Sequence, residues 1–418
     1  MKYEQTVCRS CGKTGLSIIL TLGQTPLANA LLKADELNYT ESTYPLNLAF
    51  CGSCGLVQIT DAVPPETLFK EYLYLSSFSD TMLKHSRGLV KRMIGEQRLS
   101  GDSQVIEIGS NDGYLLQYYK EAKVKVLGIE PAKNIARIAQ ETRCIRTLDE
   151  FFNESLAKRL REEGQQADVI HAHNVLAHVA DLNGMVKGIG LLLRDEGVAV
   201  IEVPYVKDLI EHTEFDTIYH EHLCYFSFTA LDRLFRRHHL AIQEVEHLSI
   251  HGGSLRLFVE KEREQEETTE RRKASPSVQR LLDEEALQGL DRVEFYHSFA
   301  EKVERLRSGL LDLLKELKKK KKRIVAYGAS AKGSTLLNYF GIGPEILDYV
   351  VDRSTLKQGL FTPGTHLPIY PPERLLDDQP DYVLLLTWNF AEEIMAQQTE
   401  YHRRGGRFII PIPDIQVV

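Results

Sequence analysis

Residues 105–116, VIEIGSNDGYLL, constrain the fold of this chain more than any other segment. An apolar run typical of a buried strand leads into a glycine-rich turn and then into a helical pattern. A second strand, 126–129, follows and ends on an acid, Glu130. A nucleoside ligand needs this arrangement, because glycine lets the backbone approach it and a carboxylate accepts both ribose hydroxyls. The segment therefore predicts a Rossmann-like α/β sheet with a nucleoside site.

The turn of this segment differs from the turn that binds a dinucleotide. A dinucleotide turn carries three glycines, and the matching positions here hold Gly109, Asn111 and Tyr114. Two of the three positions lack glycine, so the loop suits a pyrophosphate poorly. Gly109 and Asn111 are instead expected to make close contacts to a nucleoside whose ribose Glu130 holds.

Strand and helix patterns alternate on both sides of this turn. Strands are predicted near 104–108, 125–129, 168–172 and 197–203, and helices at 113–121, 131–140, 155–163 and 181–193. Alternation of this kind predicts a parallel sheet with helices on both faces. Two further strand patterns, 241–247 and 254–260, are expected to form an antiparallel pair at the edge of that sheet.

A second α/β unit begins at residue 323. The segment 324–333, IVAYGASAKG, is again strand, small-residue loop and helix, and the next strand, 346–351, ends on Asp352. Gly328, Ser330 and Gly333 nearly keep the glycine pattern, so this loop resembles a phosphate cradle more than the first loop does. Later strands are predicted at 382–386 and 407–410.

Four cysteines form two identical pairs near the N-terminus. Cys8 and Cys11, like Cys51 and Cys54, are separated by two residues, and a glycine follows each second cysteine. Tight turns of this type direct two thiolates at one ion from each side, and Zn²⁺ is the usual occupant. A disulfide is disfavoured in a reducing cytosol, and a thioredoxin-like redox motif normally occurs once. The spacing predicts a structural zinc site.

The length and net charge of the chain limit which classes of protein it can belong to. A chain of 418 residues with a net charge of −8 predicts several domains and disfavours a nucleic-acid partner. The sequence shows neither an apolar run long enough for a membrane helix nor a signal peptide, so a cytoplasmic location is expected. The predicted division is a zinc-binding module (1–66), a first α/β domain (67–262), a charged helical connector (263–322) and a second α/β domain (323–418). The run of five lysines at 318–322 is interpreted as a helix C-terminus.

Histidines concentrate in two places. His171, His173 and His178 follow the strand at 168–170, and Tyr219, His220, Glu221 and His222 stand consecutively between apolar segments. Consecutive polar side chains cannot all face solvent, so at least two of the second group are expected to point into a cleft. Acid/base catalysis is the favoured interpretation, since histidine titrates near neutral pH and a carboxylate can orient it. A structural polar cluster and a second metal site remain alternatives.

Several motifs in one order resemble a known family. They are the two cysteine pairs, LGQTPLAN at 22–29, YLYLSS at 72–77, EIGSNDG at 107–113, YHEH at 219–222 and HGGSLR at 251–256. Together they resemble the S-adenosylmethionine (SAM) dependent 3-C-methyltransferases of nucleotide-linked 4-keto-deoxysugars, most often dTDP-linked. The resemblance covers nearly the whole chain. It implies a zinc-binding module, a central SAM domain and a C-terminal α/β domain that helps hold the sugar nucleotide.

The resemblance also implies residue roles. His222 is implied as the base that removes a proton beside the sugar ketone, with Tyr219 and Glu221 lining the site. His178 would stabilise the enolate oxygen, and either Tyr72 or Tyr74, with Tyr74 favoured, would contact the substrate. The residues implied for SAM are Glu107, Gly109, Asn111, Gly113, Glu130, His173 and Asn174. The residues expected at the sugar nucleotide are Tyr72, Gly328, Ser330, Lys332, Asp352 and Trp388.

Some of these roles have structural alternatives. Glu107 lies within a strand, so it is either a ligand contact or a paired structural charge. Trp388, the only tryptophan, either stacks on a ring of the substrate or belongs to the core. His178 could equally pack under the edge of the sheet.

Other functions remain open. An O- or N-methyltransferase would need the same SAM domain and no carbon-acid base. A nicotinamide-dependent sugar-nucleotide oxidoreductase would use the loop from Gly328 to Gly333. A zinc-ribbon adaptor would use the first 65 residues to bind another protein. These residues include few arginines and lysines, which disfavours a nucleic-acid partner. The expected oligomeric state is a monomer or a small homo-oligomer.

Overall fold

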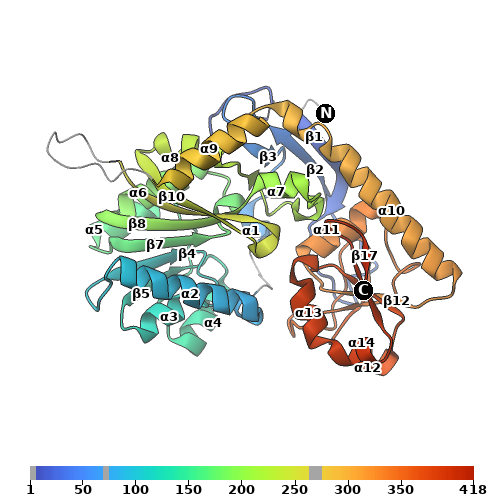
Figure 1. Cartoon of the computed structure of the whole chain (residues 1–418). Helices are drawn as coiled ribbons and strands as arrows, with labels where there is room; N and C mark the ends of the chain where they lie inside the picture. The colour runs from blue at the N-terminus through green and yellow to red at the C-terminus, as the bar shows by residue number, and fades with distance from the viewer. Residues whose placement is uncertain (1–5, 69–74, 263–274) are drawn as a thin grey trace.

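The computed structural model describes residues 6–68, 75–262 and 275–418, and these form three sheets (Figure 1). The sheets contain four, seven and six strands. The seven-stranded sheet lies at one side of the molecule, the six-stranded sheet lies at the other, and the four-stranded sheet bridges them (Figure 1). The domain boundaries at 66, 262 and 322 stay predictions.

The N-terminal sheet is antiparallel and includes a strand from the middle of the chain. Its strands are β1 (Ser17–Pro26), β2 (Thr43–Phe50), β3 (Val57–Ile59) and β9 (Cys224–Tyr225). Val57 pairs with Tyr225 and Gln58 with Cys224. The N-terminal sheet is therefore completed by the chain segment that follows the predicted catalytic motif.

The central sheet has the order β10-β11-β8-β7-β4-β5-β6. Its strands are β4 (Gln104–Ile108), β5 (Lys125–Ile129), β6 (Thr147–Leu148), β7 (Ala167–His173), β8 (Leu193–Pro204), β10 (Leu240–Leu248) and β11 (Ser254–Lys261). Strands β4 to β8 pair in parallel, and β11 pairs antiparallel with both β8 and β10. The predicted parallel sheet with an antiparallel edge pair is confirmed.

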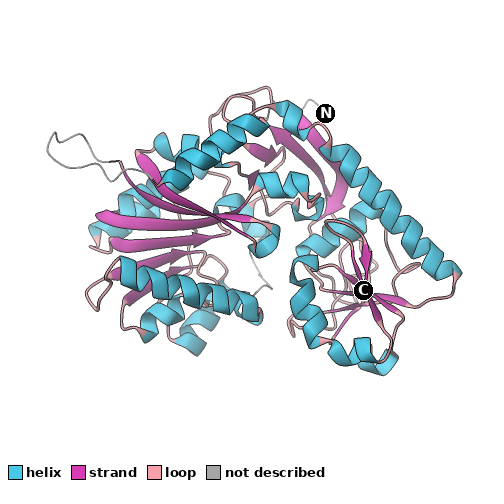
Figure 2. Ribbon diagram, viewed as in Figure 1, coloured by secondary structure: helices cyan, strands magenta, loops and turns pink. Residues whose placement is uncertain are grey.

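Helices cover both faces of the central sheet (Figures 1 and 2). They are α2 (Asp80–Glu96), α3 (Leu116–Glu121), α4 (Lys133–Arg143), α5 (Glu154–Glu162), α6 (Leu182–Leu192), α7 (Val206–Glu211) and α8 (Phe228–Arg236). Met93 of α2 and Tyr119 of α3 pack with Val105, Val169 and Val200 on one face. Alternation of side chains along each strand sends Ile106 and Ile170 to the other face, against α5 and α6.

The C-terminal sheet has the order β14-β13-β12-β15-β16-β17. Its strands are β12 (Ile324–Tyr327), β13 (Val350–Val351), β14 (Ile369–Tyr370), β15 (Tyr382–Leu385), β16 (Arg407–Ile410) and β17 (Gln416–Val417). Its helices are α11 (Ala331–Phe340), α12 (Arg374–Asp378), α13 (Ala391–Gln397) and α14 (Thr399–Arg403). The order changes direction between β12 and β15, which is where open α/β sheets bind ligands.

Two long helices join the central and C-terminal sheets, α9 (Pro276–Gln288) and α10 (Phe299–Lys319). One stripe of α10 is buried, from Phe299 through Leu310 to Leu317, and Figure 1 shows this helix running from the N-terminal sheet across the C-terminal unit. It ends at Lys319, so the lysine run is a helix C-terminus, as predicted. Among the described residues, no helix has the length and apolarity needed to span a bilayer.

The remaining described elements are short. They are α1 (Pro65–Leu68), η1 (Ser76–Phe78), η2 (Leu176–His178), η3 (Phe215–Thr217), η4 (Ile250–Gly252), η5 (Val293–Tyr296) and η6 (Trp388–Phe390), where η marks a 3-10 helix. Three of them, η2, η3 and η6, carry or adjoin predicted site residues. Short irregular segments on rigid sheets are common positions for functional side chains.

Candidate active site

The four predicted metal ligands meet at one point. The sulfurs of Cys8, Cys11, Cys51 and Cys54 all lie within 4.8 Å of one another, with Cys8 Sγ 3.5 Å from Cys54 Sγ and Cys11 Sγ 3.6 Å from Cys51 Sγ. A tetrahedral ion with Zn–S bonds of about 2.3 Å separates its sulfurs by roughly 3.8 Å, so the cluster fits zinc. The hydrogen bond between Cys8 and Cys54 lowers the pKa of Cys8 to about 5 and raises the pKa of Cys54, so a metal ion would displace the proton that the two sulfurs share.

The loop after β4 is held by Glu130, at the end of β5. The backbone N–H of Asn111 donates to Glu130 Oε2 at 3.0 Å, and Ala132 N donates to Oε1 at 2.9 Å. Burial raises the pKa of this carboxyl to about 7. Each carboxylate oxygen can accept a second hydrogen bond, so the predicted contact of Glu130 with a ribose is compatible with this structural role.

The glycines of this loop are required by packing. Gly109 and Gly113 have φ of +66° and +78°. A Cβ atom at Gly109 would lie 2.4 Å from Val175 Cγ2, and one at Gly113 would lie 2.6 Å from Ile145 Cδ1. The fold therefore accounts for both glycines, and their contact with a cofactor stays a prediction.

Two buried acceptors at the ends of β4 and β7 lack partners. Glu107 is fully buried, and neither of its carboxylate oxygens has a hydrogen-bond partner among the described residues; the same holds for Asn174 Oδ1. Burial raises the pKa of Glu107 well above its ordinary value. Buried acceptors without donors are rare, so a ligand with N–H groups and positive charge fits here. SAM carries both.

His173, at the end of β7, belongs to a buried polar network. His173 Nε2 lies 2.9 Å from His171 Nδ1, and His173 Nδ1 lies 3.1 Å from Glu202 Oε2. The far ring nitrogen of His171 bonds Tyr119, and Glu202 also accepts from Arg256 Nε at 2.6 Å. These bonds fix the ring of His173. Glu202 was not among the predicted site residues, and Arg256 was predicted only as part of the HGGSLR motif. Strands β7, β8 and β11 bring His173, Glu202 and Arg256 together.

The predicted base is oriented by its own loop. His222 Nδ1 lies 2.9 Å from the carbonyl oxygen of Thr217, and His222 Nε2 lies 2.8 Å from Tyr219 Oη. A carbonyl oxygen only accepts, so Nδ1 carries the proton and the lone pair is on Nε2. That nitrogen faces the Tyr219 hydroxyl.

His178 and His222 lie side by side although they come from different loops. Their ring centroids are 4.7 Å apart and the rings meet edge to face. Burial lowers the pKa of His178 to about 4, so this imidazole is neutral near pH 7. Leu223 N donates to Ala177 O at 2.8 Å and Ile59 N donates to Leu223 O at 3.1 Å, which ties both loops to β3.

The other two residues of the YHEH motif, His220 and Glu221, bond to residues of the N-terminal module. Glu221 is buried, accepts from Asn29 Nδ2 at 2.7 Å, and has its pKa raised to about 7 by burial. His220 turns toward β2, with Nε2 3.3 Å from Pro45 O. Asn29 is the last residue of the LGQTPLAN motif at 22–29, in which no site residue was predicted. Tyr72 and Tyr74 lie outside the described residues.

The loop of the C-terminal unit is closely packed. Ser330 caps α11, accepting from Gly333 N at 3.1 Å, and Asp352 accepts from Ala329 N at 2.8 Å. A Cβ at Gly328 would lie 2.6 Å from Thr387 Oγ1. Ser330, Asp352 and Gly328 therefore all have structural roles, and their contact with a sugar nucleotide stays a prediction.

Lys332 and Trp388 meet the central domain. Lys332 Nζ lies 4.5 Å from the centroid of the Trp388 ring and, within the described part of the chain, has no hydrogen-bond partner. Trp388 Nε1 donates to Asp216 Oδ2 at 2.7 Å, and burial raises the pKa of Asp216 to about 6. Trp388 is thus an interface residue between the two α/β units.

Replacing Asp216 with Ala is expected to loosen this interface. Trp388 is the only tryptophan and is 8% exposed, so tryptophan fluorescence reports the surroundings of this one ring. We expect a red-shifted emission, easier quenching by iodide and a loss of about 1.5–3 kcal/mol in unfolding free energy. Asp195→Ala, at a residue whose side chain is 92% exposed, is the control. Unchanged emission in Asp216→Ala would refute the contact.

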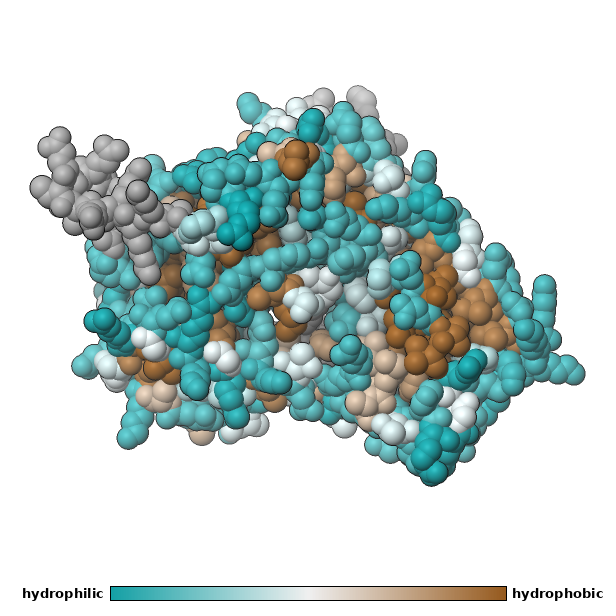
Figure 3. All heavy atoms as spheres, viewed as in Figure 1, coloured by the Kyte–Doolittle hydropathy of each residue, from teal (hydrophilic) through white to brown (hydrophobic). Residues whose placement is uncertain are grey.

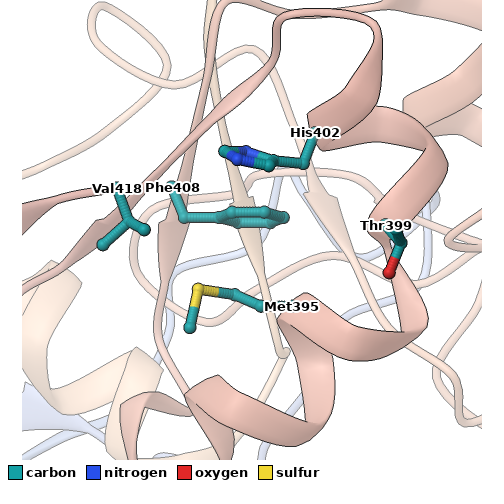
Figure 4. A pocket seen from close by; sticks show the side chains of 5 residues that line it. All are labelled: Met395, Thr399, His402, Phe408 and Val418. Atoms are coloured by element: carbon teal, nitrogen blue, oxygen red, sulfur yellow. The ribbon is translucent and has the colours of Figure 1, made fainter.

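A surface hollow elsewhere in the C-terminal unit is separate from the histidine cluster (Figure 4). Its volume is about 230 Å³, and it is lined by Met395, Thr399, His402, Phe408 and Val418. His402 stacks over Phe408 and its Nδ1 lies 3.1 Å from Gly406 O. In the space-filling view, hydrophobic atoms gather over this unit (Figure 3). None of the predicted site residues lines the hollow.

Comparison with known proteins covers all three parts of the chain. A zinc binding domain matches residues 8–69, a methyltransferase domain matches 82–245 and a C-methyltransferase C-terminal domain matches 249–413. C-methyltransferase NovU from Streptomyces niveus is 34% identical over 411 residues, which cover 98% of this chain and 96% of NovU.

Two solved structures each match nearly half of the chain. The SAM-bound magnesium protoporphyrin IX methyltransferase (ChlM) from Synechocystis PCC 6803 is 13% identical and covers 47% of this chain and 97% of its own, with a TM-score of 0.36. The PH0226 protein from Pyrococcus horikoshii OT3 is 12% identical and covers 47% and 98%, with a TM-score of 0.37.

The three matching domains and the similarity to NovU confirm the predicted fold class, enzyme class and cofactors. The chain combines an N-terminal zinc-binding module, a Rossmann-like SAM methyltransferase sheet and a second Rossmann-like sheet. From identity over nearly its full length and the three matching domains, the chain belongs to the family of SAM-dependent C-methyltransferases with an N-terminal zinc-binding domain.

Proposed function

We propose that this enzyme methylates a carbon next to the ketone of a nucleotide-linked 4-keto-deoxysugar, with dTDP the favoured nucleotide. The observation that carries the proposal is the pair formed by His178 and His222, with ring centroids 4.7 Å apart on two loops of one domain. A carbon acid beside a ketone needs a base at the C–H and a hydrogen-bond donor at the oxygen. Two adjacent imidazoles supply both.

His222 acts as the base. Its Nδ1 proton is held by the Thr217 carbonyl, so Nε2 presents the lone pair that accepts the sugar proton. The Tyr219 hydroxyl is bonded to that nitrogen at 2.8 Å and must turn away, or relay the proton, when the substrate arrives. A proton relay needs only the rotation of the hydroxyl, whereas turning away needs rotation of the Tyr219 side chain about its Cα–Cβ bond.

His178 stabilises the enolate oxygen. Burial keeps its imidazole neutral, and its one N–H bonds the backbone of Glu221 before the substrate binds. In this proposal the N–H moves from that carbonyl to the enolate oxygen, to which a neutral ring donates without giving up its proton. Preformed donors of this kind act strongly in a site from which water is excluded. The tyrosine predicted to contact the substrate, Tyr74 or Tyr72, would complete this side.

Glu107, Asn174, Asn111 and Glu130 hold the cofactor in this proposal, with Gly109, Gly113 and His173 shaping its pocket. When bound, SAM supplies a methyl group on a positively charged sulfur. The unpartnered oxygens of Glu107 and Asn174 accept from its amino group, and Glu130 accepts from the ribose. The loop that holds SAM follows β4, and His178, which contacts His222, follows the neighbouring strand β7; this arrangement favours in-line transfer.

The C-terminal unit holds the nucleotide in this proposal. Lys332 and Ser330 stand at the N-terminus of α11, where backbone N–H groups and a cation suit phosphate. Asp352 and Trp388 flank that position, and Gly328 keeps the loop tight. We also place the enzyme in the cytoplasm, where a reducing environment keeps the zinc thiols free.

Incubation with SAM and a panel of 4-keto nucleotide sugars, followed by mass spectrometry, tests the proposal. We expect one panel member to gain a single methyl group. Methylation of a sugar hydroxyl or an amine instead would favour the O- or N-methyltransferase alternative. Methylation of no keto sugar would refute the proposed substrate class.

Replacing Glu107 with Gln is expected to weaken SAM binding by roughly 10- to 100-fold, the effect of losing a hydrogen bond to a charged group. Because the pKa of Glu107 is raised in the empty site, cationic SAM should release its proton, and affinity should rise with pH. Calorimetry between pH 6 and 9 checks this. The pH dependence should flatten in Glu107→Gln and persist in Glu121→Gln, at an exposed position of α3. An unchanged dissociation constant in Glu107→Gln would exclude the role.

A further inference from the structure

Glu221 lies where the three parts of the chain meet. Its carboxyl is 3% exposed, so bulk water does not reach it. Oε1 accepts from Asn29 Nδ2 at 2.7 Å, a contact between residues that are 192 positions apart. The YHEH motif of the methyltransferase domain is thus directly bonded to the N-terminal module.

Asn29 is held firmly in place. It follows β1, in a turn closed by Ala30 N donating to Leu27 O at 3.1 Å. Just beyond the turn, Leu32 and Phe361 exchange two backbone hydrogen bonds of 2.9 and 2.8 Å. The segment that carries Asn29 is therefore fixed by β1 on one side and by the C-terminal unit on the other.

The groups that face Glu221 act in opposite directions. Burial raises the pKa of Glu221 to about 7, whereas the Asn29 amide and the charge of Lys357 lower it. Lys357 is 7% exposed and its Nζ donates to Ala329 O at 2.8 Å. The ring of His178 bonds the backbone of Glu221. The buried carboxyl is thus balanced between two protonation states near neutral pH.

We propose that Asn29 is a positioning residue of the active site. Its amide fixes in one orientation the carboxylate of Glu221, which precedes His222 in the chain and whose backbone bonds the His178 ring. The geometry supports this role because the Asn29 amide donates to a carboxylate that is shielded from water. The expected effect of Asn29 on activity rests on the proposed function. The expected effect of Asn29 on the ionisation of Glu221 does not depend on the substrate.

A double-mutant cycle tests the catalytic consequence. In Asn29→Ala we expect kcat/KM to fall roughly 10- to 100-fold, with the acidic limb of its pH profile moved to higher pH. In the Glu221→Gln background the same substitution should change kcat/KM less than threefold. The control is Asn47→Ala, in the same module, whose Nδ2 reaches only Thr60 Oγ1 at 3.5 Å. Additive losses, or an unmoved acidic limb, would overturn the proposal.

Thermal unfolding between pH 5 and 8 tests the structural part without any substrate. A buried carboxyl with a raised pKa loses stability as pH rises from its unfolded value toward 7, and removing Asn29 raises the folded pKa further. Asn29→Ala should therefore lose more stability at pH 8 than at pH 5, and Glu221→Gln should abolish this difference. Equal losses at both pH values would overturn the inference. If the wild type methylates no keto sugar, the proposed function fails. The pH dependence of unfolding still tests whether Asn29 holds the Glu221 carboxylate.

Discussion

Replacing His222 with Asn is expected to lower kcat for C-methylation by about 10²- to 10⁴-fold, the usual contribution of a general base. An amide keeps a polar side chain of similar size and cannot accept the proton. The bond from Nδ1 to Thr217 O, which orients the ring, is the reason that Nε2 is available in the native enzyme. SAM binding should change little, since the residues expected to hold it come from other loops.

Solvent exchange separates this effect from a loss of folding. The wild type should exchange the proton beside the sugar ketone with D₂O even without SAM, and His222→Asn should not. His239→Asn, at a side chain that is 89% exposed, is the control and should exchange like the wild type. Undiminished exchange and methylation in His222→Asn would show that another group is the base.

Replacing Cys51 with Ser is expected to release the metal and unfold the N-terminal sheet. Zinc binding contributes about 10–16 kcal/mol in small zinc domains, comparable to the whole stability of a typical domain. The sheet it holds includes β9, which directly follows Glu221 and His222. Hydrogen exchange should therefore rise in residues 43–59 and in 223–225, and activity should fall with it.

Metal content and SAM affinity provide the internal checks for this variant. Elemental analysis should show one zinc per chain in the wild type and none in Cys51→Ser, with SAM binding largely retained by the central sheet. Cys144→Ser, at an exposed cysteine outside the cluster, should keep its zinc. A zinc-free protein with native exchange at 223–225 would contradict the coupling between the module and the catalytic loop.

Much of the fold could be predicted because the parallel strands are continuous apolar runs. The predicted strand at 104–108 matches β4 and that at 125–129 matches β5. Helix α3 begins at Leu116, later than the predicted residue 113, because Gly113 has a φ of +78° and still belongs to the turn. The strand predicted at 346–351 shrinks to Val350–Val351, because Ile346 N and Leu347 N donate to Gly343 O in a turn and residues 347–349 are irregular.

Site features that depend on neighbouring residues could be predicted from the sequence, whereas contacts between distant segments could not. Two CxxC pairs predicted the cysteine cluster because each pair is a local turn. Strand β9 has two residues and pairs with a strand far away in the sequence, so no local pattern indicates it. The bonds from Asn29 to Glu221 and from Glu202 to Arg256 likewise join distant segments. Such contacts follow from the assembled sheets, which one sequence does not reveal.

The most direct test of the central claim follows the transferred methyl group itself. SAM labelled with ¹³C in its methyl group is incubated with the enzyme and the reactive keto sugar, and the product is examined by carbon NMR. The account predicts a methyl bonded to the ring carbon beside the ketone, with the loss of that carbon's proton signal. A methyl bonded to oxygen or nitrogen, with the ring C–H intact, would contradict it.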